Sequence, residues 1–442
     1  MKFVIISNSG EGLPIALRLR KEGVDVDIYV HTPDCRNNYD GILPKLSSQQ
    51  LKTALKKADI VFFDMVRVNQ KKKEDAVLLK TFGLKNSVPE IFGQLGDLLK
   101  RDHRVIGTSA LASELELDRR KGMELAKRMG FVLPEMHEFK MLKDGIKFLK
   151  ANSEDLWVFK PNDNRDLDLT YVEKFKGELA AKMENEYSVR LKDNIEYVLQ
   201  KKIEGAEIST ECWIGEQGIV HQNHTLENKR LMNGNLGPAI GSQSNTVWLM
   251  NKDEIKDCSV IPCLSRMADY LYKEGYRGPY DANCIVKNGK PYFLEHTPRC
   301  GFDALFCLLT LLKSKLSDFL FRENFDAEFQ DGFASSQRIS IPPFPYSATE
   351  LRKVLAKDVS IFGTLKDYPF FWAEDVYSDN GKLKCAGADG ILGVVTAWGK
   401  TIEESWGRCY HNIGKLKVCS YLQFRMDGLS EALKRYKKLE TA

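Results

Sequence analysis

Short apolar runs alternate with amphipathic stretches over the first hundred residues of the chain. FVIIS (3–7), VDVDIYV (24–30) and DIVFFDM (59–65) are rich in β-branched and aromatic residues and end in polar turns, which predicts buried strands. LPIALRLRKEG (13–23) and LSSQQLKTALKKA (46–58) place apolar residues at helical spacing instead. Strands that alternate with helices in this way predict a parallel sheet wound in the Rossmann manner.

Strand-like runs dominate the middle of the chain, from about residue 155 to 300. In chain order they read LWVFKP, EYVLQKKI, ISTECWI, GIVHQNH, ANCIVK and PYFLEH. Asn288-Gly289 separates the last two runs and predicts a tight β-hairpin. The apolar stretch FDALFCLLTLLKSKLSDFLF (302–321) that follows has the length and composition of a helix.

The last hundred residues predict a further folded unit. Small residues and prolines in GFASSQRISIPPFPY (332–346) indicate a domain boundary or a strand at a sheet edge. The segment 390–418 has the pattern strand, turn, helix. We therefore expect an α/β protein (α+β as a whole) with a Rossmann-like domain over 1–103, a central domain over 104–332 whose small lobe covers about 121–200, and a C-terminal α+β domain over 333–442.

Two glycine-containing stretches bear on ligand binding. Met232–Gln243 is rich in small residues and lacks the periodicity of a helix or a core strand, so we expect a loop there. Because Lys229 and Arg230 precede it, this loop either has no specific role or approaches an anion. The turn after the first strand contains Gly10 and Gly12 without the GxGxxG pattern, and its amides could meet an anion at a helix start.

Composition narrows the class of protein. The 442 residues are 43% hydrophobic and 29% charged, and 65 basic against 61 acidic residues give a net charge of +4, which indicates no nucleic-acid partner. No run approaches the ~20 apolar residues that span a bilayer, and the opening MKFVIISNSG lacks the pattern of a secretion signal. Ten cysteines without CxxC pairs favour reduced thiols, so we expect a cytoplasmic protein without a membrane partner.

Two segments suit a nucleotide. Lys160 ends an apolar run, where its ammonium can pair with a phosphate oxygen, although alone it would be read as a surface lysine. In VLQKKIEGAEIS (198–209), residues after Leu199 can form an extended hinge whose backbone binds an adenine edge, and Glu207 can accept hydrogen bonds from ribose hydroxyls. Taken alone, this second segment is equally a plain turn with a solvated glutamate.

A third segment, YFLEHTPRCG (292–301), suits a metal ion. Glu295 ends an apolar strand, where an ionised carboxylate is costly unless it is paired or binds a metal. Magnesium bound to nucleotide phosphates uses one or two protein carboxylates, and Glu295 with Asp281 or Asn283 fits that arrangement. Arg299 is close enough in sequence to clamp a carboxylate or a phosphate bidentately.

These segments, in this order, resemble the ATP-grasp superfamily and within it the phosphoribosylamine–glycine ligases (glycinamide ribonucleotide synthetases). The resemblance extends along the chain through GTSALASELELDRRKGMELAKRMGFVLP, VLQKKIEGAEIS, LENKRLMNGNLGPAIG, GYRGPYDANCIVKNGKPYFLEHTPRCG and GADGILGVVTAWGKTIEESWGRCYHNI. It implies an ATP-grasp fold and an ATP-dependent carboxylate–amine ligase that forms an amide through an acyl phosphate. The implied partners are a small-molecule acid and amine, and the implied state is a monomer or a homodimer.

The resemblance also implies roles for individual residues. ATP would be bound by Arg119, Lys160, Gln200, Lys202 and Glu207. Mg²⁺ or Mn²⁺ would be held by Glu295, Asp281, Asn283 and Thr297. Charge at the reacting groups would be stabilised by Lys229, Arg230 and Arg299. The substrate pocket would be lined by Asn233, Asn235, Gly237 and Pro238.

Departures from the family pattern concern the substrates and ATP turnover. The first turn lacks the family's arginine and histidine, and residues 161–168 lack the glycines of its phosphate flap. Asn233 and Asn235 replace two aspartates, and Thr297 replaces a metal-binding asparagine. We therefore expect an amino acid such as glycine to be joined to an amine other than phosphoribosylamine. The alternatives are a true phosphoribosylamine–glycine ligase, a non-catalytic nucleotide-binding relative, and a carboxylase that uses bicarbonate.

Overall fold

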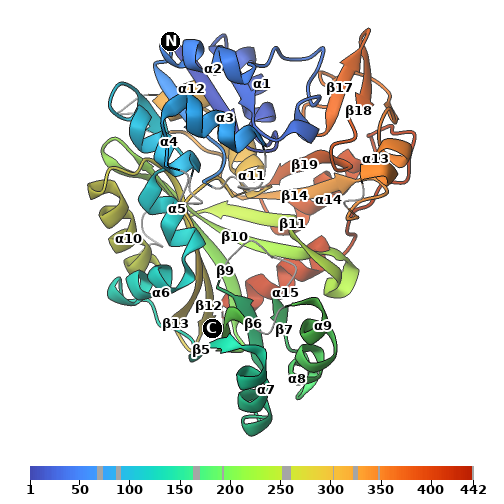
Figure 1. Ribbon diagram of the computed structural model, residues 1–442. Coiled ribbons are helices and arrows are strands. Elements are labelled where there is room, and N and C mark those ends of the chain that lie inside the picture. Colours follow the sequence, from blue (N-terminus) through green and yellow to red (C-terminus); the bar gives the residue numbers. More distant parts are fainter. Residues whose placement is uncertain are drawn as a thin grey trace.

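The computed structural model describes residues 1–66, 73–85, 91–162, 170–191, 194–250, 260–301, 303–321, 327–346 and 349–440. Within these residues, two smaller sheets lie at opposite ends of the molecule and a large sheet runs between them (Figure 1). No helix of the described residues is long and apolar enough to cross a bilayer.

The N-terminal sheet is parallel, with the strand order β2-β1-β3-β4, which confirms the Rossmann-like pattern predicted from the sequence. Its faces are covered by helices, and the helix predicted at 46–58 is shorter because a capping box fixes its start. The elements of this region are β1 (Lys2–Ser7), α1 (Leu13–Lys21), β2 (Asp25–Val30), α2 (Ser48–Leu55), β3 (Ile60–Phe63), α3 (Lys73–Phe82), α4 (Ile91–Leu99) and β4 (Arg104–Ile106).

The small lobe is built on an antiparallel sheet with the order β5-β8-β6-β7. Aromatic side chains fill its core, where Phe159 and Phe139 both stack on Tyr197. Its elements are β5 (Met136–Met141), α7 (Leu142–Ala151), β6 (Trp157–Pro161), β7 (Tyr171–Val172), α8 (Glu178–Lys182), α9 (Ser188–Arg190) and β8 (Asn194–Lys201).

The large sheet has eight strands in the order β13-β12-β9-β10-β11-β14-β19-β16. The strands are β9 (Ala206–Gly215), β10 (Gly218–Met232), β11 (Leu236–Leu249), β12 (Gly278–Lys287), β13 (Lys290–Thr297), β14 (Phe333–Ser340), β16 (Phe371–Ala373) and β19 (Ile391–Gly399). The helices around it are α5 (Ala110–Leu117), α6 (Arg119–Arg128), α10 (Ile261–Lys273), α11 (Ala304–Leu311), α12 (Leu316–Phe321), α14 (Ile402–Ile413) and α15 (Gly428–Glu440). A small sheet, β15-β18-β17, and α13 complete the fold: β15 (Ser360–Ile361), β17 (Val376–Asp379), β18 (Lys382–Cys385) and α13 (Thr349–Leu355).

The hairpin predicted at Asn288-Gly289 is confirmed, since both residues have positive φ between β12 and β13. Two other predictions are wrong in detail. The helix expected at 302–321 is broken into α11 and α12, because the backbone at Leu312 pairs with Phe329. β14 lies between β11 and β19, so the sheet-edge alternative for 332–346 is wrong, whereas the domain-boundary alternative stays a prediction; the prolines follow the strand and leave its ladder intact.

The loop expected at Met232–Gln243 is also wrong in large part. β10 continues to Met232 and β11 begins at Leu236, so the two form one long antiparallel hairpin. The first residues of β11 are mostly exposed, and exposed strand residues need no apolar alternation, which is why the pattern missed them. The large sheet also joins strands from both sides of residue 332, and the domain limits remain a prediction.

Candidate active site

One face of the large sheet is apolar and the other is polar along three neighbouring strands. In β9, Ile208 and Cys212 point into the core beneath α6 and α10, so the alternate residues Glu207, Ser209 and Glu211 lie on the opposite face. The register continues this polar face onto β12 and β13: Asp281 stands opposite Glu211 and Thr297, and Asn283 opposite Ser209 and Glu295. Period-two alternation in the sequence therefore collects the predicted metal ligands on one surface.

Within this polar face, Ser209, Asn283 and Asp281 form a hydrogen-bonded chain. Ser209 Oγ donates to Asn283 Oδ1 at 2.8 Å, and Asn283 Nδ2 donates to Asp281 Oδ2 at 3.0 Å. Asp281 Oδ1 is buried without a hydrogen-bond partner among the described residues. Burial and the charge of Glu227 raise the pKa of Asp281 to about 7, so this carboxyl favours a cation as a neighbour.

Glu295 is held ionised by the cations around it. Partial burial alone would raise its pKa, but the charges of Lys229, Lys160 and Arg119 outweigh that effect and lower the pKa to about 2. Among the described residues, no group of three or more His, Cys, Asp or Glu side chains could hold a metal ion by itself. The orphaned oxygen of Asp281 and the ionised Glu295 nevertheless supply two hard ligands, which fits a magnesium ion that also binds phosphate oxygens.

Lys229 lies among three carboxylates. Its Nζ is 3.5 Å from Glu207 Oε1, 3.6 Å from Glu227 Oε2 and 3.5 Å from Glu295 Oε1. Burial would lower the pKa of Lys229, but these carboxylates outweigh it and raise the pKa. The ammonium is therefore charged at neutral pH and joins the predicted ribose-binding, catalytic and metal-binding residues in one cluster.

Lys160 reaches this cluster from the small lobe. It lies on β6, its side chain is 9% exposed, and no carboxylate or hydrogen-bond acceptor of the described residues contacts its ammonium. Burial, with repulsion from Arg119 and Lys229, lowers the pKa of Lys160 to about 7. Burying an ammonium beside other cations is costly, and an anionic ligand such as a phosphate would offset that cost.

The hinge residues differ in what they offer a ligand. Gln200 on β8 is 2% exposed, and its Oε1 is buried without a partner among the described residues. Lys202 is engaged within the small lobe, because its Nζ donates to the Glu173 carbonyl at 2.9 Å and its N–H to the Leu156 carbonyl at 2.8 Å. The unpaired Oε1 of Gln200 fits a base that donates a hydrogen bond, whereas the ammonium of Lys202 is already bonded to the Glu173 carbonyl.

Arg119 and Arg299 approach Glu295 from the side of α5 and α6. Arg119 begins α6 and its charge interacts with Glu295 and Lys160. Arg299 Nε donates to Glu116 Oε1 at 3.0 Å, and both side chains are largely buried. The structure thus places Arg299 in an ion pair with Glu116, and its charge also interacts with Glu295.

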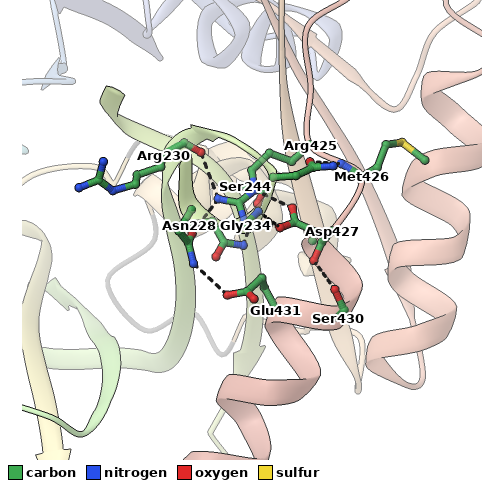
Figure 2. A network of polar contacts seen from close by, with 12 residues as sticks. Asn228, Arg230, Gly234, Ser244, Arg425, Met426, Asp427, Ser430 and Glu431 are labelled. Atoms are coloured by element: carbon green, nitrogen blue, oxygen red, sulfur yellow. Dashed lines mark hydrogen bonds and ion pairs between the residues drawn. The ribbon is translucent and has the colours of Figure 1, made fainter. Parts of the chain in front are cut away.

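The remaining predicted residues lie at the end of the β10–β11 hairpin, where Figure 2 shows Arg230 and Gly234. Arg230 Nη1 donates to the Gly237 carbonyl at 2.8 Å and bridges the two strands. Asn233 Oδ1 accepts from the Met426 N–H at 3.0 Å, and Asn235 Nδ2 donates to Glu431 Oε2 at 3.1 Å. These two asparagines hold the turn against the C-terminal segment. Their predicted contact with substrate, like that of Gly237 and the exposed Pro238, stays a prediction.

Sequence reasoning missed the arginine at the centre of this network. Arg425 is 0% exposed and donates to the Arg230 carbonyl at 3.1 Å and to Asn235 Oδ1 at 2.9 Å (Figure 2). Its guanidinium also pairs with Asp427, whose Oδ2 accepts the Gly234 N–H at 2.7 Å. Nothing in the sequence near residue 425 indicates this role, although Asn-Gly-Asn at 233–235 is a turn signal that could have revealed the hairpin.

The N-terminal turn does not offer free amides. Asp64, which follows β3, accepts the N–H groups of Asn8 at 3.1 Å and Gly12 at 2.9 Å. Glu11 Oε2 accepts the N–H of Ser9 at 3.1 Å. The expectation that these amides could meet an anion is therefore wrong, because the chain's own carboxylates occupy them.

Comparisons with known proteins identify the class of fold. No protein-family model matches the sequence, and no curated protein matches it. Among solved structures, phosphoribosylamine–glycine ligase from Thermotoga maritima has a TM-score of 0.69 at 17% identity, covering 97% of this chain and 100% of that one. Biotin carboxylase from Campylobacter jejuni has a TM-score of 0.63 at 13% identity, covering 99% and 96%. N5-carboxyaminoimidazole ribonucleotide synthetase from Thermus thermophilus has a TM-score of 0.56 at 12% identity, covering 93% and 98%.

These neighbours are all ATP-grasp enzymes, and the chain has the ATP-grasp fold. The expectation of that fold is confirmed, including the parallel N-terminal sheet and the large antiparallel sheet. Among the structures compared, one neighbour is a phosphoribosylamine–glycine ligase, the kind of enzyme that the sequence resembles.

Proposed function

We propose that the protein is an ATP-dependent carboxylate–amine ligase that binds magnesium and ATP between the small lobe and the polar face of the large sheet. The observation that carries this proposal is the buried side chain of Lys160, whose pKa is lowered by burial and neighbouring cations and whose charge interacts with the ionised Glu295. The phosphate oxygens of a triphosphate would pair with Lys160, and the metal ion bound to the triphosphate would be held by Glu295. The fold and the printed activities of the neighbours support the same class of reaction.

Each lobe contributes a distinct part of the binding site. From the small lobe, Lys160 pairs with phosphate oxygens, and Gln200 presents an unpaired acceptor to a base. From the large sheet, Glu295 and Asp281 hold Mg²⁺ or Mn²⁺ through hard oxygen ligands. ATP supplies the phosphoryl group that activates a carboxylate as an acyl phosphate, which an amine then attacks to give an amide, ADP and phosphate.

The cations of the chain stabilise charge at the reacting groups. Lys229 projects from β10 into the carboxylate cluster, and Arg230 follows it at an irregularity in the β10–β11 pairing. Because both are fixed before a ligand arrives, they act on developing negative charge without reorganising. We propose that glycine or a similar amino acid supplies the carboxylate and that an amine other than phosphoribosylamine attacks it. We also propose that the protein is cytoplasmic and that it is a monomer or a homodimer.

The proposal is tested by ADP release from magnesium-ATP, with amino acids crossed against a panel of amines and products identified by mass spectrometry. We expect turnover only when both an acid and an amine are present. Glu295→Ala and Arg230→Ala should abolish it, whereas Glu154→Ala, which changes a side chain that is 90% exposed, should not. Nucleotide binding without turnover for any pair would instead favour the non-catalytic relative.

A further inference from the structure

A second cluster of carboxylates lies at the carboxyl end of the N-terminal parallel sheet. In the order β2-β1-β3-β4, the chain changes direction between β1 and β3, and ligands of open parallel sheets bind outside the strand ends at such a point. The turn after β1 carries Glu11, and Asp64 follows β3. Ser7 Oγ donates to Asp64 and accepts the Gly10 N–H, which ties the turn and the carboxylate together.

This turn is built to exclude an anion. Helix starts bind phosphates through free backbone N–H groups, but here those of Asn8 and Gly12 donate to Asp64 and that of Ser9 to Glu11. A phosphate at this point would have to displace Asp64 and approach the charge of Glu11. The site therefore disfavours a sugar phosphate.

Three further carboxylates from other parts of the chain face the same place. Asp303 precedes α11, Glu374 follows β16 and Asp389 precedes β19. Glu374 interacts electrostatically with Asp303, Glu11 and Asp389, and Asp389 interacts with Glu11. Arg338 on β14 is the cation that acts on Glu11, Glu374 and Asp389, and its Nη2 pairs with Asp303 Oδ1 at 2.9 Å. One arginine does not balance four acidic side chains in addition to Asp64.

Two buried amides beside this cluster have carbonyl oxygens without donors. Asn38 is 3% exposed, its side chain makes no hydrogen bond within the described part of the chain, and its Nδ2 lies beside Gly10 of the turn. Gln243, on β11 next to Arg338, has a buried Oε1 that likewise lacks a partner among the described residues. A buried acceptor left unpaired loses its hydration without a compensating hydrogen bond, so both residues favour a ligand that brings hydrogen-bond donors.

The cluster adjoins the proposed active site. The charge of Asp303 acts on Glu227, one of the three carboxylates around Lys229. Gly301 lies next to Glu211 on the polar face of the large sheet. A substrate whose reacting group lies near Lys229 can therefore extend toward Glu11 and Asp64 without leaving polar surface.

We propose that this cluster binds a second ammonium group of the amine substrate, which is therefore a diamine or a longer polyamine. The inference rests on the proposed ligase function. An ammonium brings three donors and no acceptor, which matches carboxylates and amide carbonyls that lack donors. One amine reacts at the acyl group while the other stays protonated among Glu11, Asp303, Glu374 and Asp389.

The test compares the binding of 1,5-diaminopentane and pentylamine by isothermal titration calorimetry, with magnesium and a non-hydrolysable ATP analogue present. We expect the diamine to bind at least about tenfold more tightly, since a hydrogen-bonded ion pair at a buried site is worth about 1.5–3 kcal/mol. Glu11→Gln and Glu374→Gln should each remove most of that preference, whereas Glu154→Gln should keep it. Equal binding of the two amines, or a preference that survives both variants, would overturn the proposal.

A gain-of-function variant keeps the test independent of folding. Asn38→Asp adds a carboxylate beside Gly10 and should tighten diamine binding several-fold, which a merely destabilised protein would not do. Weaker diamine binding by a folded Asn38→Asp protein, or binding of inorganic phosphate that competes with the diamine, would count against the proposal.

The outcome also separates this inference from the ligase itself. Diamine binding that depends on Glu11 and Glu374, without ADP release for any acid, would support the cationic site and reject the ligase. ADP release with monoamines as efficient as with diamines would support the ligase and reject the cationic site.

Discussion

Replacing Lys160 by methionine should stabilise the unliganded protein and abolish nucleotide binding. Methionine keeps the unbranched apolar stem that packs in β6 and removes the buried ammonium. No partner among the described residues loses an interaction in this variant. Burial and the repulsion from Arg119 and Lys229 therefore make the native lysine costly to folding, and a bound anion would offset that cost.

The cost follows from the pKa of Lys160. Burial and neighbouring cations lower it from its ordinary value of 10.5 to about 7. At pH 7 the unfolded chain carries the proton and half of the folded molecules do not, which gives a cost of about 4 kcal/mol at most. Because the unfolded state binds more protons between pH 7 and pH 10.5, the stability of the wild type rises across this window. The advantage of the variant should therefore shrink toward zero by about pH 10.5.

The assay is guanidinium unfolding of both proteins at pH 7, 8.5 and 10, with titration calorimetry of magnesium-ADP at pH 7. We expect Lys160→Met to gain about 2–4 kcal/mol at pH 7. Lys201→Met is the matched control on β8, since it removes a surface pair with Asp155 and should change stability by less than about 1 kcal/mol. A variant that is less stable than the wild type at pH 7, or that binds magnesium-ADP as tightly, would refute this account of Lys160.

Three further predictions address the same site. Glu295→Gln should weaken the magnesium dependence of ADP binding by at least about tenfold, measured by titrating magnesium at fixed nucleotide; unchanged dependence would remove Glu295 as a ligand. Arg425→Met should lower the free energy of unfolding in guanidinium by about 3–5 kcal/mol, because it leaves Asp427 and buried acceptors unpaired. Arg408→Met, which breaks an exposed ion pair, is the control and should lower it by less than about 1 kcal/mol. Magnesium-ADP affinity should fall about tenfold from pH 7 to pH 8.5 as Lys160 loses its proton, and Lys160→Arg should flatten the profile.

Strands with strong apolar patterns were predictable from the sequence, and so were the residues at their ends. Lys160 and Glu295 each lie within a strand that the sequence marks clearly. Period-two alternation also places Asp281 and Asn283 on one face. The sequence does not show that Lys160 is buried or that Lys229 lies among three carboxylates, because those facts depend on how distant strands pack together.

The hairpin network escaped prediction for a different reason. The first residues of β11 are small and mostly exposed, so no apolar period marks them as a strand. Arg425 contacts Arg230 and Asn235 across about 190 residues of chain, and a single sequence has no signal for such a pairing. The sequence therefore does not predict that the side chains of Asn233 and Asn235 bind the C-terminal segment, and their contact with substrate stays a prediction.

The charges around Lys229 suggest how nucleotide binding and catalysis are linked. Without a ligand, Lys229 partly neutralises Glu207, Glu227 and Glu295 and so reduces the repulsion among them. Glu295 can pair with Lys229 or coordinate a divalent cation, and a cation at Glu295 and Asp281 takes over part of that neutralisation. We infer that Lys229 then becomes available to a phosphate oxygen, so the residue that stabilises the resting cluster is also the one released for the reaction. On this view Glu295→Gln removes a metal ligand and also loosens Lys229, so its effect on turnover should exceed its effect on nucleotide affinity.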